Sequence, residues 1–509
     1  MASGPKGPPR RAAGGGGAEA PPFQGPSIDP ITFMLNTSRS LVGGLLLVVV
    51  SAGLAGLAHP KARGSLKPRA IPAYTGLDTG VPLAAALSPD GRRVAVLAIV
   101  PPASLGAGPY PLTLQIWDAD QLTLLKGREI AVPRQPQIDS STPEREIAPL
   151  GCVVRYAGNG ASLVVAEGSV RAGPEDGISS LSASQARLHI LAADDLRELQ
   201  SFDLDLASDP RTLGIMDMQV SPSGDRIAVA LSPIDFSIGF GNGASCQAFQ
   251  GSEARVYDLG TGRELWKAPF ENARIGGLGW APDGSSLAVT LQTGPGEDPV
   301  AQAFCPERKV DHNLLILDSA SGRVLSGLST GDVAGPICLG PRHEVFTAPY
   351  HFFYTKIADE KAKVWNSQTG AVERTIACPG RDVHDVLALS RDASLLVGYV
   401  GKERFDFSWR TMQDLPENLD ERFAVWDARS GNLLHVSPSF VPLTRPAGKR
   451  PAQKPDLGWL PPALRKLSDR IMRVQSAPGK PQVQVAADGS KVLVSWPWRG
   501  SPLLFDLPK

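Results

Sequence analysis

A short pattern recurs seven times between Leu83 and Leu507, and it constrains the fold of this chain more than any other feature. One half of the pattern is a tight turn followed by an apolar run, as in the segment that starts at Ser88. The other half is an apolar strand that ends in an aromatic or aliphatic residue and Asp, as at Trp117-Asp118. A unit of this kind makes one small antiparallel sheet that cannot bury both faces alone, so the copies must stack on one another.

Most of the turn halves contain proline, glycine or both. Proline presets φ for the second turn position, and glycine accepts the left-handed conformation that closes a hairpin. The seven copies are Ser88-Pro89-Asp90-Gly91, Ala157-Gly158-Asn159-Gly160, Ser221-Pro222-Ser223-Gly224, Ala281-Pro282-Asp283-Gly284 and the weaker Gly340-Pro341-Arg342-His343, Ser390-Arg391-Asp392-Ala393 and Ala486-Ala487-Asp488-Gly489.

The strand halves end in a similar way throughout. In four of them Thr-Gly or Ser-Gly follows, at Gly262, Gly322, Gly370 and Gly431. There the Asp or Asn side chain can bond backbone groups two residues on, while glycine turns the chain into the next strand. The ends are Trp117-Asp118, Tyr257-Asp258, Leu317-Asp318, Trp365-Asn366, Trp426-Asp427, Phe505-Asp506 and, more loosely, Leu191-Ala192-Ala193-Asp194.

Each unit therefore contains four short strands, and seven units predict an all-β, seven-bladed β-propeller. The alternative is a β-sandwich in which the turns recur by chance. The chain resembles the WD40-like propellers, especially their bacterial relatives with Ser-Pro-Asp-Gly turns, over about residues 70–509. It departs from the strict WD40 pattern because no Gly-His dipeptide precedes the first strand of each unit. The last unit lacks an outer strand, and we expect residues 70–77 to supply it and close the ring.

Charge and composition restrict the function less than the repeat restricts the fold. The chain has 51 basic and 51 acidic residues, so no global field favours nucleic acid as a partner. Residues 1–38 form a tail that is rich in Pro, Gly and Ala and has no apolar periodicity, so we expect it to be disordered.

An uncharged stretch between Arg39 and Lys61 predicts a transmembrane helix over residues 40–60, because its 21 residues are about the length that spans a bilayer. Two alternatives are a buried helix and a cleaved signal peptide, for which Gly56 and Ala58 are small enough to form the cleavage site. The chain is thus expected to be a single-pass membrane protein that contacts the membrane through residues 40–60.

The two signals for membrane orientation disagree. The basic residues Lys61, Arg63, Lys67 and Arg69 favour a cytoplasmic propeller.

Cysteines favour the opposite side, because Cys246 and Cys305 fall in corresponding long links of neighbouring units and suit a disulfide in an oxidising compartment. The alternative is two unrelated thiols. An extracytoplasmic propeller is slightly favoured. The other three cysteines, Cys152, Cys338 and Cys378, lie in or beside apolar runs and are expected to be core residues.

The link between the second and third strands is long in nearly every unit. In a propeller these links leave the ring on one face, which predicts a binding surface there; tolerated drift of surface loops is the alternative. The links cover residues 99–111, 167–185, 231–253, 291–312, 349–360 and 401–420.

A further insertion, residues 436–482, links the sixth unit to the seventh and is strongly basic. Pro461-Pro462 can start a helix that places Leu464, Leu467, Ile471 and Val474 on one stripe. We expect either a basic cap for an anionic partner, such as lipid headgroups, or a solvated helix over the rim. The candidate basic residues are Arg445, Lys449, Arg450, Lys454, Arg465, Lys466, Arg470, Arg473 and Lys480, against Asp456 and Asp469.

No motif identifies a reaction, a cofactor or a metal site. The closest histidine pair, His343 and His351, flanks an aromatic stretch and is expected to be structural. The sequence predicts a membrane-anchored propeller that is a protein- or ligand-binding scaffold without catalysis. Two alternatives remain open: a propeller enzyme, such as a hydrolase, a lyase or a quinoprotein-like oxidoreductase, with its site at the channel mouth, and an envelope structural protein.

Overall fold

The chain divides into two compact units, residues 1–58 and 59–509, and every described residue belongs to the second. The predicted tail and the predicted span over residues 40–60 lie outside the described residues. The described part of the computed structural model contains no helix that is long and apolar enough to cross a bilayer. It comprises residues 66–72, 81–99, 112–130, 147–149, 152–171, 182–206, 213–233, 251–292, 311–330, 334–349, 361–401, 420, 422–439, 482–496 and 501–508.

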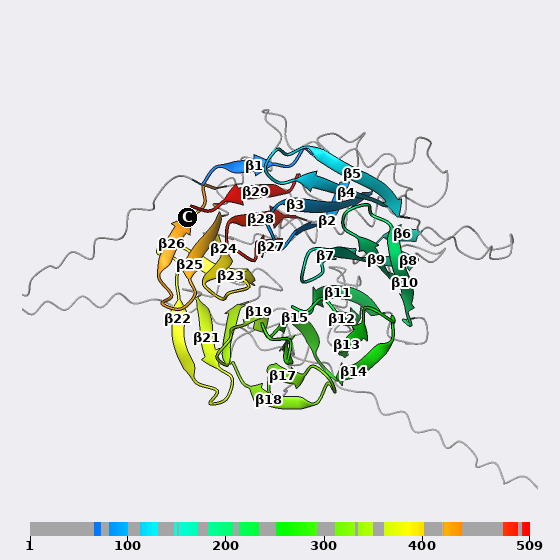
Figure 1. The fold of residues 1–509 in the computed structure, drawn as a ribbon. Coiled ribbons are helices and arrows are strands. Elements are labelled where there is room, and N and C mark those ends of the chain that lie inside the picture. Colours follow the sequence, from blue (N-terminus) through cyan, green and yellow to red (C-terminus); the bar gives the residue numbers. More distant parts are fainter. Residues whose placement is uncertain are drawn as a thin grey trace, which may run out of the picture. The chain divides into compact units, whose positions relative to one another are not determined.

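Seven antiparallel sheets make up the described part of this unit, and Figure 1 shows them around a central axis. We number them as blades in chain order and give their strands from the axis outward. Blade 1 holds β2 (Val81–Leu87), β3 (Arg93–Ile99), β4 (Leu112–Asp118) and β5 (Leu124–Ile130). Blade 2 holds β7 (Val153–Tyr156), β8 (Ser162–Arg171), β9 (Ser182–Ala192) and β10 (Glu198–Leu204), with β6 (Ile147–Pro149) also paired to β8. Blade 3 holds β11 (Leu213–Val220), β12 (Arg226–Pro233), β13 (Ser252–Asp258) and β14 (Glu264–Phe270).

The remaining blades repeat this order. Blade 4 holds β15 (Arg274–Trp280), β16 (Ser286–Gln292), β17 (Leu314–Asp318) and β18 (Val324–Leu328). Blade 5 holds β19 (Ala334–Leu339), β20 (Glu344–Pro349), β21 (Ala362–Asn366) and β22 (Val372–Ile376). Blade 6 holds β23 (Asp382–Leu389), β24 (Leu395–Gly401), β25 (Arg422–Asp427) and β26 (Leu433–Val436). Blade 7 holds β27 (Gln482–Val485), β28 (Lys491–Ser495), β29 (Leu503–Asp506) and, as its outer strand, β1 (Pro68–Ala70).

The innermost strands contact one another in ring order, from β2 through β7, β11, β15, β19 and β23 to β27, which returns to β2. This arrangement confirms the predicted all-β, seven-bladed propeller and excludes a two-sheet sandwich. The second strands are almost fully buried, because a blade lies against each of their faces; β16 is buried at every position except its first residue. Outer strands such as β5 are mostly exposed.

The amino-terminal end closes the ring, but not with the residues expected from the sequence. Strand β1 pairs with β29 from Pro68 to Ala70, so the predicted range of 70–77 overlaps it at Ala70 alone. The backbone N–H of Ile71 still donates to the carbonyl of Pro502 at 3.0 Å, and the Ile71 side chain is fully buried. Pro72 has no N–H to continue the ladder, and the strand ends before it.

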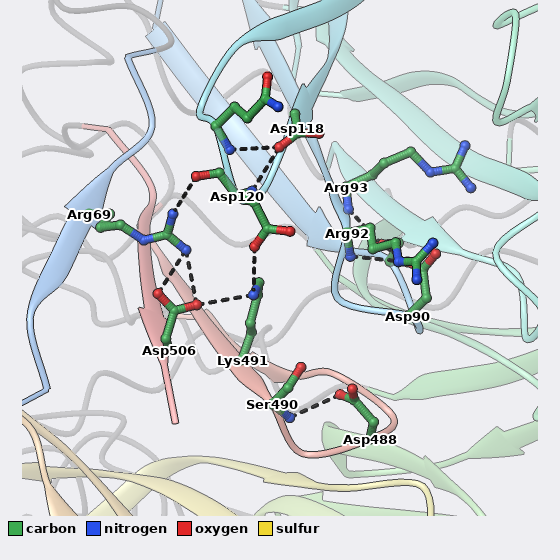
Figure 2. A network of polar contacts seen from close by, with 12 residues as sticks. Arg69, Asp90, Arg92, Arg93, Asp118, Asp120, Asp488, Ser490, Lys491 and Asp506 are labelled. Atoms are coloured by element: carbon green, nitrogen blue, oxygen red, sulfur yellow. Dashed lines mark hydrogen bonds and ion pairs between the residues drawn. The ribbon is translucent and has the colours of Figure 1, made fainter. Parts of the chain in front are cut away.

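Charged side chains hold this closing strand in place (Figure 2). The Arg69 guanidinium lies 2.9 Å from the Asp506 carboxylate of blade 7 and donates to the backbone carbonyl of Asp120 in blade 1 at 2.8 Å. Lys491 lies between the same two acidic residues, 2.9 Å from Asp120 and 3.0 Å from Asp506. The closure therefore joins β1, the last blade and the first blade in one network.

Candidate functional site

The propeller has two faces that differ in how the chain crosses them. The first strand of each blade leads into a tight turn, and the third strand leads into another; we call the face that carries these turns the turn face. The links from second to third strands, and from one blade to the next, lie at the opposite ends of the strands, on what we call the insertion face. The inner turns meet on the turn face, where Ala487 of blade 7 donates its N–H to the Pro89 carbonyl of blade 1 at 2.8 Å.

All six long links expected from the sequence begin and end on the insertion face. Most of their residues lie outside the described part of the chain. Blade 2 corrects the expected boundaries, because residues 167–171 and 182–185 are not loop but continue β8 and β9 as a paired extension. These two strands have 10 and 11 residues, and β6 adds a third strand at their tip. Alternating small and polar residues in this stretch had masked its strand character.

The basic insertion also starts and ends on the insertion face, after Val436 and before Gln482. Its predicted helix and its basic residues from Arg445 to Lys480 lie outside the described residues.

A buried ion pair lies at the root of the long link in blade 3. Glu253 and Arg255 lie two positions apart on β13, so their side chains are on the same face of the sheet. These side chains are only 5% and 7% exposed. Arg255 also donates to the backbone carbonyl of Asp205 in blade 2 at 2.9 Å. Burial raises the pKa of the neighbouring Tyr257 hydroxyl to about 12, although its hydrogen bond with Arg255 acts in the opposite direction. A buried charge is tolerated only when it is paired in this way.

Blade 6 has a similar pair that is only partly buried, with the Asp420 side chain 23% exposed and that of Arg422 29% exposed. Asp420 accepts from Arg422, two residues further on, at 2.6 Å, and it also pairs with Arg381 from the link between blades 5 and 6. Arg422 donates to the carbonyl of Ser437 at 3.2 Å. Burial raises the pKa of Asp420, but hydrogen bonds and charge from the two guanidinium groups outweigh it and leave the pKa below its ordinary value. The end of the long link that enters β25 is thus held by charge.

Blade 2 has a related cluster at the root of its extension. His189 of β9 and Glu167 of β8 are both almost fully buried, with Nε2 of His189 3.3 Å from Oε2 of Glu167. Glu198 of β10 lies 3.5 Å from the other ring nitrogen of His189 and 3.5 Å from Arg128 of blade 1. The cluster therefore crosses the junction between blades 1 and 2.

These three sites were missed in the sequence, although a signal exists for two of them. An acidic residue and an arginine two positions apart open the third strand in blade 3, at Glu253-x-Arg255, and in blade 6, at Asp420-x-Arg422. Because strand side chains alternate, this spacing places both on the same face of the sheet. No such signal exists for Glu167, His189 and Glu198, which only the pairing of three strands brings together.

The residues expected to be in the core are found there. Cys378 is buried, and Cys152 and Cys338 pack against apolar clusters. Burial raises the pKa of the Cys152 and Cys338 thiols to about 12, so these thiols are not activated as nucleophiles. The pair Cys246 and Cys305 lies outside the described residues.

The histidines do not form a metal site in the described part. His343 is exposed in a turn with φ +64° and contacts the Gln368 amide nitrogen at 3.1 Å, while His351 lies outside the described residues. Within the described ranges, no three His, Cys, Asp or Glu side chains are placed to hold a metal ion. No protein-family model matches this chain, and no curated protein sequence matches it either.

Proposed function

We propose that this protein is a membrane-anchored, WD40-like propeller that binds a protein partner or ligand on its insertion face, without catalysis. The seven-bladed fold is compatible with such a binding scaffold. The observation that supports the proposal is the concentration of long links on one face, with a buried ion pair at the root of the link in blade 3 and a partly buried one at the root of the link in blade 6.

Fixed roots matter because binding by a long link costs the entropy of ordering it. A pair such as Glu253 and Arg255 restrains the chain where the link leaves the sheet, so less ordering remains for the partner to induce. On the turn face the connections are short and bond to themselves, which leaves little chain to adapt to a partner.

The test is proximity labelling in native cells with the full-length protein. In one variant, residues 235–249 of blade 3 are replaced by a short Gly-Ser link; a second variant has residues 403–418 of blade 6 replaced in the same way. The matched control is Arg197→Ala on the exposed turn face, where the side chain is 69% exposed. Binding on the insertion face predicts that labelled partners are lost in the two link variants and kept in the control. Partners that persist in both link variants, with the propeller still folded, contradict the proposal.

The proposed anchor is residues 40–60, and the proposed anionic partner of residues 441–480 is the lipid headgroup layer. Removal of residues 1–60 should release a folded propeller from membranes. If that shortened protein stays in the membrane fraction after a carbonate wash, a second membrane contact exists, and charge-reversing changes at Arg465, Lys466 and Arg470 should then abolish it. Full release supports residues 40–60 as the only anchor.

The propeller is proposed to lie outside the cytoplasm, with a disulfide between Cys246 and Cys305. Such a bridge persists only in an oxidising compartment. Thiol labelling of protein from its native host, with and without reductant, followed by peptide mapping, should find both thiols protected until reduction. Two free thiols would place the propeller on the cytoplasmic side, as the basic flank from Lys61 to Arg69 favours.

A further inference from the structure

The buried cluster in blade 2 places one imidazole between two carboxylates. Nε2 of His189 lies 3.3 Å from Glu167, and Nδ1 lies 3.5 Å from Glu198 and makes no hydrogen bond within the described part of the chain. The His189 side chain is 5% exposed and that of Glu167 is 4% exposed. Solvent therefore has little access to His189 and Glu167, whereas the Glu198 side chain is 34% exposed.

Two further ion pairs complete the surroundings of His189. Arg128 of blade 1 faces Glu198, and Arg187 of β9 binds Asp203 of β10 at 2.7 Å. The remaining polar neighbour is the thiol of Cys152, next to Glu167, which burial keeps protonated. The titratable and charged groups around His189 are thus Glu167, Glu198, Asp203, Arg128, Arg187 and Cys152.

The charge of this cluster depends on one proton. Three carboxylates face two guanidinium groups, so the cluster is neutral when His189 carries a proton and has one excess negative charge when it does not. A protonated ring has an N–H at both nitrogens and can serve both carboxylates, whereas a neutral ring has one. Loss of the proton leaves one carboxylate without a charged donor in a site that water reaches poorly, which is costly.

We propose that protonation of His189 stiffens the root of the β8–β9 extension and that its loss loosens the junction between blades 1 and 2. This inference rests on the proposed function, because the extension belongs to the insertion face and its rigidity would regulate binding there.

The experiment is hydrogen–deuterium exchange of the full-length protein, read by mass spectrometry at about pH 5.5 and pH 8. Protection factors are corrected for the intrinsic pH dependence of amide exchange. For peptides from β8 and β9 we expect protection on the order of tenfold higher at the lower pH, the effect of one hydrogen bond to a charged group. Peptides from β16 and β17 of blade 4 supply the internal reference.

His189→Gln should abolish the pH dependence in β8 and β9, because glutamine keeps one donor and one acceptor but does not titrate. Glu167→Gln should reduce it, since one of the two carboxylates is removed. The matched control is His435→Gln in blade 6, a partly buried histidine that should leave blade 2 unchanged.

Equal protection of β8 and β9 at both pH values in the wild-type protein overturns the proposal, and so does an unchanged pH dependence in His189→Gln. If blade 4 peptides show that His189→Gln does not fold, the wild-type protein and Glu167→Gln decide the matter. Hydrogen–deuterium exchange is measured without a binding partner. A negative result for the effect of His189 protonation is therefore distinguishable from failure of the proposed binding function.

Discussion

The turn face and the insertion face use charged side chains in opposite ways. On the turn face, most aspartates are at least partly exposed and bond to residues two or three positions away, as Asp258 does to the N–H and hydroxyl of Thr261, both at 2.7 Å. On the insertion face, charges such as those of Glu253 and Arg255 are buried and paired. A local hydrogen bond can be repeated in every blade, whereas a buried ion pair depends on the particular residues that surround it. The turn face therefore carries the repeat, and the insertion face carries what is individual to this protein.

The largest effect should come from breaking a buried pair on the insertion face. Arg255→Met removes the guanidinium that pairs with Glu253 in a site that is 5% exposed, which should cost about 3–5 kcal/mol of unfolding free energy. Urea denaturation measures this loss. Glu253→Met combined with Arg255→Met should recover most of it, because no charge is then left buried.

The control for this comparison is Arg197→Met on the turn face, which should leave stability unchanged because its side chain is 69% exposed. Equal losses at Arg255 and Arg197 would show that the two faces do not differ in the way described.

A second prediction concerns how closely the inner turns approach. A Cβ added at Gly158 would lie 2.1 Å from the Pro222 carbonyl oxygen of the neighbouring blade, a backbone atom that cannot move away easily. Gly158→Ala should therefore cost about 2–3 kcal/mol by forcing these turns apart. Gly127→Ala is the matched control on an outer strand, where the nearest atom lies at 3.9 Å, and it should be neutral or slightly stabilising. Denaturation midpoints of the two variants that coincide would refute close packing of the inner turns.

A third prediction separates contact from backbone conformation at two glycines, Gly322 on the turn face and Gly380 in the link between blades 5 and 6. Gly322 and Gly380 both have φ +69°, but a Cβ at Gly322 would meet the Trp266 ring at 2.7 Å, whereas nothing lies within 4 Å at Gly380. In both variants an alanine must adopt a left-handed backbone conformation, which should lower the free energy of unfolding by roughly 1 kcal/mol. Gly322→Ala should lose about 1–2 kcal/mol more, because the turn packs on the outer strand of the preceding blade. Thermal unfolding of the two variants measures the difference, and equal losses would exclude a role for the Trp266 contact.

The smallest effect should be the acid sensitivity of the turn face. Hydrogen bonds from Thr261 hold the pKa of Asp258 below its ordinary value, and bonds from Ser430 do the same for Asp427. A lowered folded-state pKa gives stability that is present above the unfolded-state pKa and is lost as pH falls through the folded-state pKa. The melting temperature should thus fall modestly between about pH 5 and pH 3. Replacing Asp258 and Asp427 together by Asn should lower the melting temperature at neutral pH and flatten this acid dependence; an unchanged slope would contradict it.

The sequence predicts what neighbouring residues determine and misses what distant ones assemble. The turns at Ser88 and Asp258 are readable, because their bonds lie within a few residues and recur at a fixed spacing. The seven blades follow from that recurrence. By contrast, the cluster of His189 with Arg128 depends on which blade lies beside which, and the closing strand depends on where Pro72 interrupts a ladder. The positions of the long links could be predicted from the sequence, but the residues at which they begin and end could not, as the extension of β8 shows.

The ring closure has a consequence for how the protein is made. Every blade but the last pairs strands that are near in sequence, whereas Arg69 must wait for Asp506, 437 residues later. At roughly 5–20 residues per second, a ribosome needs on the order of 20–90 seconds to supply β29 after β1 has emerged. Throughout that interval the first strand has no partner, and the growing arc of blades ends in an open flank. The newborn chain is therefore most exposed to aggregation and proteolysis until β29 has been made, and agents that protect it should act before that strand pairs with β1.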